Sequence, residues 1–140
     1  MVDGNFIDEH RRHILETLNI LCSINLNSDL NKHEQAGTAT FIMNIYSGIE
    51  NILRHVLEEV KMTKLPRTST WHKDILNQSV EKGMISGDLK ENLSAYMRFR
   101  HRHVHGYGYM DDWRLVKPLA LNAASTVDKF FFELKNTGVM

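Results

Sequence analysis

Apolar residues recur every three or four positions along most of the chain, which is the spacing of one face of an α-helix. The longest such run forms one broad face of a predicted helix: Ile42, Ile45, Tyr46, Ile49, Ile52, Leu53, Val56, Leu57 and Val60. No segment shows the strict alternation of apolar and polar residues that is typical of a β-strand. The pattern therefore predicts an all-α fold.

Capping and loop-forming residues divide this pattern into helical segments. The predicted helices cover about Asp8–Ile24, Asn31–Met62, Thr70–Val80, Asp88–His105 and Trp113–Leu134. Asn31 followed by Glu34 has the spacing of a capping box. The caps expected for the later helices are Thr70, Asp88 with Glu91, and Asp111 or Asp112, and Gly106 and Gly108 are expected to end the fourth helix.

Helices joined by short loops predict an antiparallel helical bundle of four to five helices. A chain of 140 residues is large enough to bury one hydrophobic core. We find no internal repeat and no linker, so residues 1–140 are expected to form a single domain. The buried side of the fourth helix is expected to include Leu89, Leu93, Tyr96 and Met97.

Composition and charge exclude some classes of protein and some cellular locations. The formal net charge is zero, which argues against a protein that coats nucleic acid through bulk charge. Cys22 is the only cysteine, so the chain forms no internal disulfide, which fits the reducing cytoplasm that we expect as its location. We expect no signal peptide and no membrane span, because no apolar run approaches the necessary length.

The segment from Phe99 to Tyr109 is the richest in candidate chemistry. It places two arginines and three histidines within positions 100–105 and then continues into a glycine-tyrosine turn. Arginine binds phosphate through a permanently charged fork of donors. Histidine is the side chain best suited to proton transfer near neutral pH. Together they indicate chemistry on a phosphodiester.

Arg100 occupies an unusual place on the fourth helix. At about 100° per residue it falls within the apolar stripe formed by Leu89 and Leu93. Arginine is rarely buried without a partner. Two interpretations remain open: a structural salt bridge, with Glu50 as the first candidate partner, or a stripe that faces a cleft or dimer seam where Arg100 meets a ligand phosphate.

The histidines do not favour a metal site. His101 and His105 are spaced to share a metal on a helix, but no acidic residue lies among them and the interleaved arginines would repel a cation. We therefore expect neither a metal nor another cofactor. His72 is expected to be a satisfied surface histidine, and Tyr46 and Tyr96 are expected to lie in the core.

The order Arg100, four residues, His105, one residue, Tyr107 spells R-x4-H-x-Y, which resembles the signature of the HEPN superfamily and its HepT-like toxins. Four blocks from about residue 34 onward match one HepT-like branch in order and spacing: 46–53, 71–76, 99–101 and 106–119. Sequences of this branch often carry an arginine directly before the motif histidine. Here Val104 takes that position and Arg102 lies two residues earlier.

The resemblance implies an all-α domain that forms a homodimer and places both motif copies in one shared cleft. It implies a metal-independent ribonuclease toxin, encoded beside a nucleotidyltransferase antitoxin of the MNT type. Carried over by position, Arg100 and His105 match the active pair. Tyr107 matches a tyrosine to which the antitoxin adds AMP. Arg102, His101 and Glu50 are expected to support phosphate binding.

The chemistry of the residues agrees with RNA cleavage. His105 can act as base or acid, and Arg100 can stabilise the phosphorane oxygens. A two-fold dimer would supply a second His105. Two other interpretations stay open. The chain is alternatively a catalytically inactive module that docks a nucleotidyltransferase or a nucleotide, or a plain bundle with an Arg100–Glu50 pair and no active cleft.

Overall fold

The computed structural model describes residues 4–106 and 112–139 of the chain. These residues form five helices and no strand, which confirms the predicted all-α class. The helices are α1 (Gly4–Cys22), α2 (Lys32–Glu59), α3 (Trp71–Glu81), α4 (Gly87–His105) and α5 (Trp113–Asn136).

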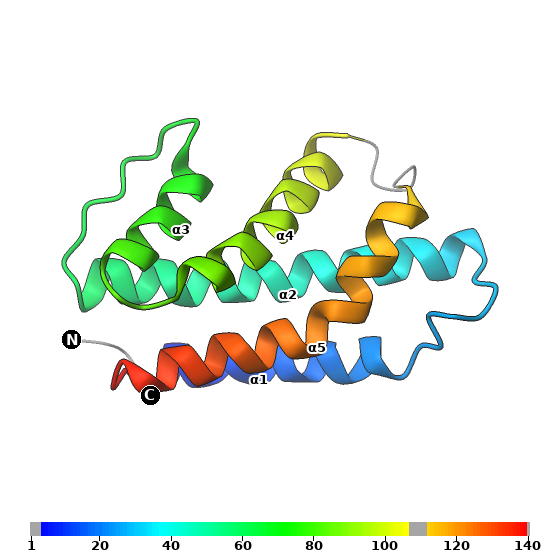
Figure 1. The fold of residues 1–140 in the computed structure, drawn as a ribbon, viewed down its shortest axis with the longest axis horizontal. Helices are drawn as coiled ribbons and strands as arrows, with labels where there is room; N and C mark the ends of the chain where they lie inside the picture. The colour runs from blue at the N-terminus through cyan, green and yellow to red at the C-terminus, as the bar shows by residue number, and fades with distance from the viewer. Residues whose placement is uncertain (1–3, 107–111, 140) are drawn as a thin grey trace.

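Helix α2 is the longest element and contacts each of the other four helices. Figure 1 shows that α1 and α2 run in opposite directions, with α3 and α4 above them in this view. The C-terminal part of α5 lies beside α1, and the two helices are in contact. The arrangement is the antiparallel bundle predicted from the sequence, with α2 as its centre.

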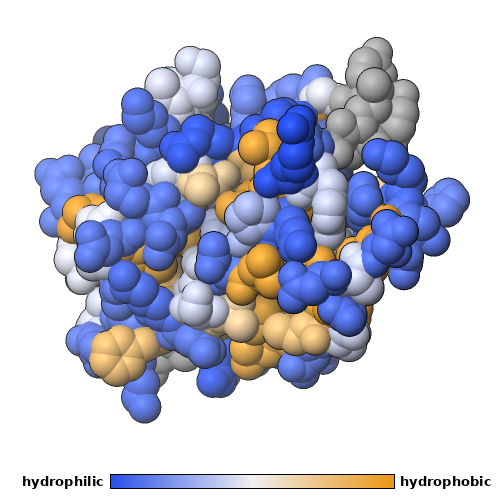
Figure 2. All heavy atoms as spheres, turned by 45° about the vertical axis from the view of Figure 1, so that its right-hand side comes forward, coloured by the Kyte–Doolittle hydropathy of each residue, from blue (hydrophilic) through white to orange (hydrophobic). Residues whose placement is uncertain are grey.

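Polar and charged side chains cover most of the face shown in Figure 2, and apolar side chains reach the surface between them. Among residues 4–106 and 112–139, the large apolar residues that are more than half exposed are Ile20, Met62, Leu115, Leu121 and Phe132. They lie on α1, on α5 and after the end of α2, at a distance in sequence from the Arg/His-rich segment.

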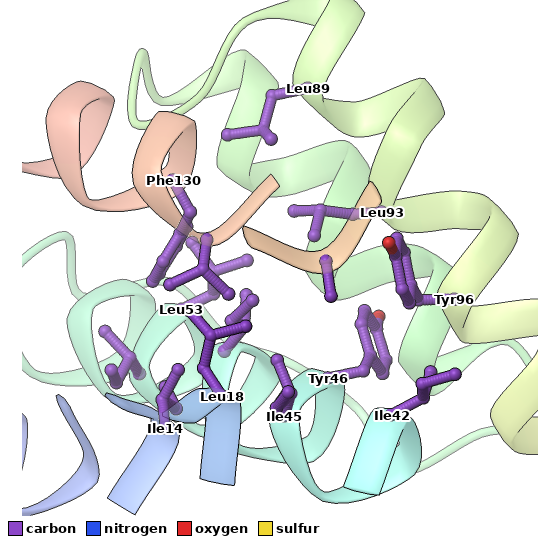
Figure 3. Close-up of a cluster of buried hydrophobic side chains, with 14 of the residues drawn as sticks. Ile14, Leu18, Ile42, Ile45, Tyr46, Leu53, Leu89, Leu93, Tyr96 and Phe130 are labelled. Carbon is purple, nitrogen blue, oxygen red and sulfur yellow. The ribbon is translucent and has the colours of Figure 1, made fainter. Parts of the chain in front are cut away.

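The core is formed where the apolar faces of all five helices meet, and Figure 3 shows the part of it between α1, α2, α4 and α5. Its fully buried members include Ile14, Leu53, Leu89, Leu93 and Phe130, each at most 2% exposed. Burying one such side chain stabilises the fold by about 1.5–3 kcal/mol. Helix α1 approaches α2 closely at Gly48, where an added Cβ would lie 2.7 Å from Cγ1 of Ile14.

Two of the predicted caps are confirmed. The Glu34 amide donates to Oδ1 of Asn31 over 2.8 Å. The Asn31 amide donates to Oε1 of Glu34 over 3.0 Å, which completes the capping box. Asp112 caps α5 by accepting from the Arg114 amide over 2.9 Å. The other candidate cap of α5, Asp111, lies outside the described residues.

The expected cap of α4 is wrong. Helix α4 begins at Gly87, and Ser86 is its cap because its Oγ accepts from the Leu89 amide over 3.1 Å. Asp88 therefore lies in the first turn. Ser86 also donates to the Glu133 carboxylate on α5 through its amide and its hydroxyl, at 2.6 and 2.9 Å, so one residue caps α4 and joins it to α5.

Two helix ends differ in detail from the prediction. Thr70 occupies the cap position of α3, but its hydroxyl donates to Asp74 Oδ2 over 3.0 Å and caps no backbone amide. Helix α2 stops at Glu59, so Val60 is 38% exposed and does not belong to the buried face. Three residues beyond the end of α2, Met62 has a positive φ of 51°.

Gly106 ends α4 as predicted, and a glycine is needed there because the backbone lies close to the Arg102 carbonyl group. Its φ of −98° is open to any residue, but an added Cβ would lie 2.8 Å from the Arg102 carbonyl oxygen. Gly108, the second expected terminator, lies outside the described residues.

Candidate functional site

A cleft of about 290 Å³ opens between α2, the start of α3 and the second half of α4. Three segments that are far apart in the sequence line it: Tyr46 and Glu50 from α2, Ser69, Thr70, His72 and Lys73 from around the start of α3, and Met97, Arg98, Arg100 and His101 from α4. The Arg/His-rich segment therefore borders a cavity at its N-terminal end.

Arg100 lies half-buried at this cleft. Its Nε donates to Oγ of Ser47 on α2 over 2.9 Å. The two terminal nitrogens of the guanidinium have no hydrogen-bond partner among the described residues. Within that part of the chain the guanidinium is held through Nε, and its two terminal nitrogens are the donors with which an arginine can bind a phosphate in bidentate fashion.

Of the two interpretations left open for Arg100, the salt bridge with Glu50 is not the one found in the described residues. No ion pair joins the two side chains within the part of the chain that the structure describes. Glu50 instead places Oε1 at 2.7 Å from Nδ1 of His72, and Arg100 takes the Ser47 hydroxyl. A buried carboxylate requires a partner. For Glu50 that partner comes from α3 and not from α4.

Glu50 and Tyr46 form the buried floor of the cleft. Tyr46 is 1% exposed and Glu50 is 7% exposed. Neither the Tyr46 hydroxyl nor Oε2 of Glu50 has a hydrogen-bond partner among the described residues. Burial raises the pKa of Tyr46 well above its ordinary value, and the charge of Glu50 raises this pKa further, so Tyr46 remains a neutral phenol. The core assignment of Tyr46 and Tyr96 is confirmed.

The cleft carries a local excess of positive charge. Lys73, Arg98 and Arg100 contribute cations to its wall, and Glu50 is the single carboxylate among the lining residues. A chain with zero net charge therefore concentrates cations at one concave place. Such a cleft attracts an anion such as a phosphate group.

His101 lines the cleft, but His105 does not. The two rings lie one helical turn apart with their centroids at 4.6 Å. His105 therefore contacts a residue of the cleft lining without lining the cleft itself. Arg102 is exposed and lies over the Phe99 ring at 5.6 Å, away from the lining. The structure thus brings Arg100, His101 and Glu50 to one cavity and places Arg102 and His105 outside its lining. Tyr107 lies outside the described residues.

Neither a metal-binding cluster nor a membrane-spanning helix occurs in the described residues. In residues 4–106 and 112–139, no group of three or more His, Cys, Asp or Glu side chains is arranged to hold a metal ion. Over the same residues, none of the helices combines the length and the apolarity required to cross a bilayer.

The helical bundle and its cation-lined cleft define an all-α protein with a candidate anion-binding site. The model of a family described as "HepT-like protein" matches residues 37–137, and the chain belongs to this family. The matched region contains most of the central helix, the cleft residues and the R-x4-H-x-Y segment. The resemblance seen in the sequence is therefore confirmed at the level of the family.

A solved structure shows the same fold. The structure described as the cytosolic protein of unknown function YutE from Bacillus subtilis has a TM-score of 0.75 to this chain, and the match covers 97% of this chain and 90% of YutE. The two chains share 11% sequence identity, so the likeness concerns the fold alone. No curated protein matches the chain.

Sequence reasoning missed His72 as a member of the site. Two signals were present: Glu50 at the edge of an apolar face requires a partner after burial, and His72 falls in the first turn of a helix that follows a loop. The spatial relation of α3 to α2 decides that these residues meet, and no spacing along the chain encodes it.

Proposed function

We propose that this protein is a metal-independent endoribonuclease toxin of the HEPN/MNT type. The observation that carries the proposal is the half-buried Arg100, held by Ser47 at a cation-lined cleft, in a chain of the HepT-like family. Arg100 binds the scissile phosphate and stabilises the charge that develops on its oxygens. His105 transfers a proton. His101 contributes its ring to the cleft lining, Arg102 adds positive charge on the same helix outside the lining, and Glu50 supports the cleft.

The proposal includes a homodimer and a nucleotidyltransferase partner of the MNT type. A two-fold axis would place two motif copies in one cleft. Residues that lie outside the lining in one chain, such as His105, would then join the site from the second copy. AMP attached to Tyr107, two residues after His105, would bring a negative phosphate and a bulky base to this region. The modification would compete with RNA for Arg100 and silence the enzyme.

The test is cleavage of RNA by the purified chain in the presence of a chelator. Arg100→Ala and His105→Ala are each expected to abolish cleavage while circular dichroism shows an unchanged helical content. Arg12→Ala is the matched control, because Arg12 is an exposed arginine of α1 that pairs with Glu16. Cleavage by Arg100→Ala at the wild-type rate would refute the assignment.

The position of His105 favours a second candidate function. His105 does not line the cleft, and Val104 stands where the resemblance leads us to expect an arginine. The cleft therefore also suits a catalytically inactive module that binds a nucleotide or docks a nucleotidyltransferase. A purified dimer that binds ATP or the nucleotidyltransferase and leaves every RNA intact would establish this alternative.

A further inference from the structure

The hydrogen bond between Glu50 and His72 joins two helices at the cleft. The residues are 22 positions apart, and Oε1 of Glu50 lies 2.7 Å from Nδ1 of His72. Their exposures differ: the Glu50 side chain is 9% exposed, and the His72 side chain is 40% exposed. The carboxylate is therefore enclosed by protein, while the imidazole that it holds is accessible from the cleft.

A carboxylate bonded to one ring nitrogen determines what the other can do. When Nδ1–H donates to the carboxylate, the neutral ring carries its lone pair on Nε2. The same contact limits rotation of the ring and stabilises the imidazolium formed after proton uptake. Nε2 of His72 has no hydrogen-bond partner among the described residues. In this tautomer Nε2 is the atom that can accept a proton.

The charges around His72 are suited to a phosphodiester substrate. Tyr46 and Glu50 face the cleft from α2, Lys73 lies next to His72 on α3, and Arg98, Arg100 and His101 face it from α4. A nucleotide phosphate held by Arg100 would lie in the same cavity as the imidazole. The pair therefore stands beside the phosphate ligand of the proposed reaction.

We propose that His72 is the general base of this cleft and that Glu50 is the positioning residue that holds it, an inference that rests on the ribonuclease function proposed above. Nε2 of His72 takes the proton of the ribose 2′-hydroxyl. The 2′-oxygen then forms a bond to phosphorus as the bond from phosphorus to the 5′-oxygen breaks. His105 gives a proton to the departing 5′-oxygen, which leaves a 2′,3′-cyclic phosphate and a 5′-hydroxyl.

The assignment separates the two proton-transfer roles. One His105 cannot serve as base and acid in the same step, and His105 does not line the cleft of its own chain. His72 does line it and supplies the base from the same chain, so the acid is the only role left for the His105 of either copy. His105 then has the role of acid alone. The two histidines consequently respond in different ways when the leaving group no longer needs a proton.

The experiment compares His72→Gln and His105→Gln on two RNA substrates that differ at the bridging 5′ position of the cleaved bond. One substrate carries the natural oxygen and the other carries sulfur, which leaves as a thiolate without protonation. We expect His72→Gln to lower cleavage of both substrates by about 100-fold or more, as for loss of a general base. His105→Gln should fail on the oxygen substrate and recover on the sulfur substrate.

Matched variants test the pair itself. His33→Gln changes an exposed histidine at the start of α2, outside the cleft lining, and should cleave at the wild-type rate. Glu50→Gln should lower cleavage, and combining it with His72→Gln should lower cleavage no further, because Glu50 acts through the imidazole. Added imidazole should restore part of the activity of His72→Ala, since the open cleft admits it; a purely structural His72 would not show this rescue.

Two outcomes overturn the assignment of His72 while leaving the ribonuclease function intact. These are wild-type cleavage by His72→Gln, and recovery of His72→Gln on the sulfur substrate, which would make His72 the acid. Multiplicative losses in the Glu50→Gln/His72→Gln double variant would overturn the positioning role of Glu50. If the wild-type dimer cleaves neither substrate, the proposed function fails and the assignment of His72 fails with it.

Discussion

From Leu89 to Phe99, helix α4 buries apolar side chains against α2 and α5, whereas from Arg100 to His105 the same helix carries cations and histidines. Leu89 and Leu93 are completely buried. Arg100 is half-buried beside the cleft, and His105 is exposed. One continuous helix therefore anchors its first half in the core and carries its arginines and histidines on its second half.

The first half of α4 is expected to determine stability, and the second half is expected to determine the proposed activity. The first half is fixed by packing and by its attachment to α5, so it holds the second half at a constant position. The second half contributes little buried apolar area and is free to carry charges that would be costly inside the core. Substitutions in the two halves should therefore change different measurements, and the largest effect is expected in the packed half.

Leu93→Ala should have the largest effect, and on stability. Leu93 is completely buried, so truncating it removes apolar contacts and leaves a cavity. The free energy of unfolding should fall by about 2–5 kcal/mol. Chemical denaturation of the purified protein measures the change.

The control for the core variant is Leu121→Ala on α5. Leu121 is 52% exposed. Because an exposed side chain makes few contacts, its loss should change stability by about 0.5 kcal/mol. Equal losses in both leucine variants would contradict the description of the core.

Arg100→Lys should reduce RNA cleavage and leave stability nearly unchanged. Lysine keeps the charge but lacks the fork that binds two phosphate oxygens. Loss of a charge-assisted hydrogen bond is worth about 1.5–3 kcal/mol, or roughly 10- to 100-fold in rate. Single-turnover cleavage compares the variant with Arg12→Lys, a change on exposed α1. If Arg100→Lys cleaves as fast as wild type, the fork has no role.

Ser86→Ala should weaken the attachment of the first half of α4. The variant loses the side-chain cap of the Leu89 amide and the hydroxyl contact with Glu133. Loss of a helix cap lowers stability by about 1 kcal/mol. Thermal or chemical unfolding measures the loss. Asp88→Ala is the informative comparison, because the structure places Asp88 in the first turn and gives the cap to Ser86. A larger loss in Asp88→Ala would restore the original capping prediction.

Ser47→Ala should have the smallest effect, and on function alone. It removes the acceptor that orients Nε of Arg100. A hydrogen bond of this kind is worth about 1 kcal/mol. Cleavage should fall by a few-fold while the unfolding transition stays in place. Ser125→Ala, which removes an exposed hydroxyl on α5, serves as the control. A stability loss without a change in cleavage would show that the contact serves packing only.

Much of the fold follows from local sequence. The period of the apolar residues in α2 and the Asn31–Glu34 capping box determine where helices form, and both require only neighbours within a few positions. The errors occur where a local rule has competing solutions. Asp88 and Ser86 are both acceptable caps, and the contact of Ser86 with Glu133, 47 positions away, favours Ser86.

The site was predictable to a smaller extent. The spacing of Arg100 and His105 and the placement of Arg100 on an apolar stripe identified the second half of α4 as a candidate site, and the structure places Arg100 at a cleft. The hydrogen-bond partners of Arg100 and Glu50 could not be predicted, because several polar side chains on other helices were possible partners for each group. Ser47 and His72 became the partners through the packing of α4 and α3 against α2.

The sequence by itself determined the helices, the all-α bundle and the family, because apolar periodicity, capping residues and motif order are properties of residues close together in the chain. Only the tertiary structure decided that Arg100 binds Ser47, that Glu50 binds His72, and that a cleft lies between them. The physical reason is that a buried polar group must find a partner within hydrogen-bond distance. Which partner lies there depends on how the helices pack.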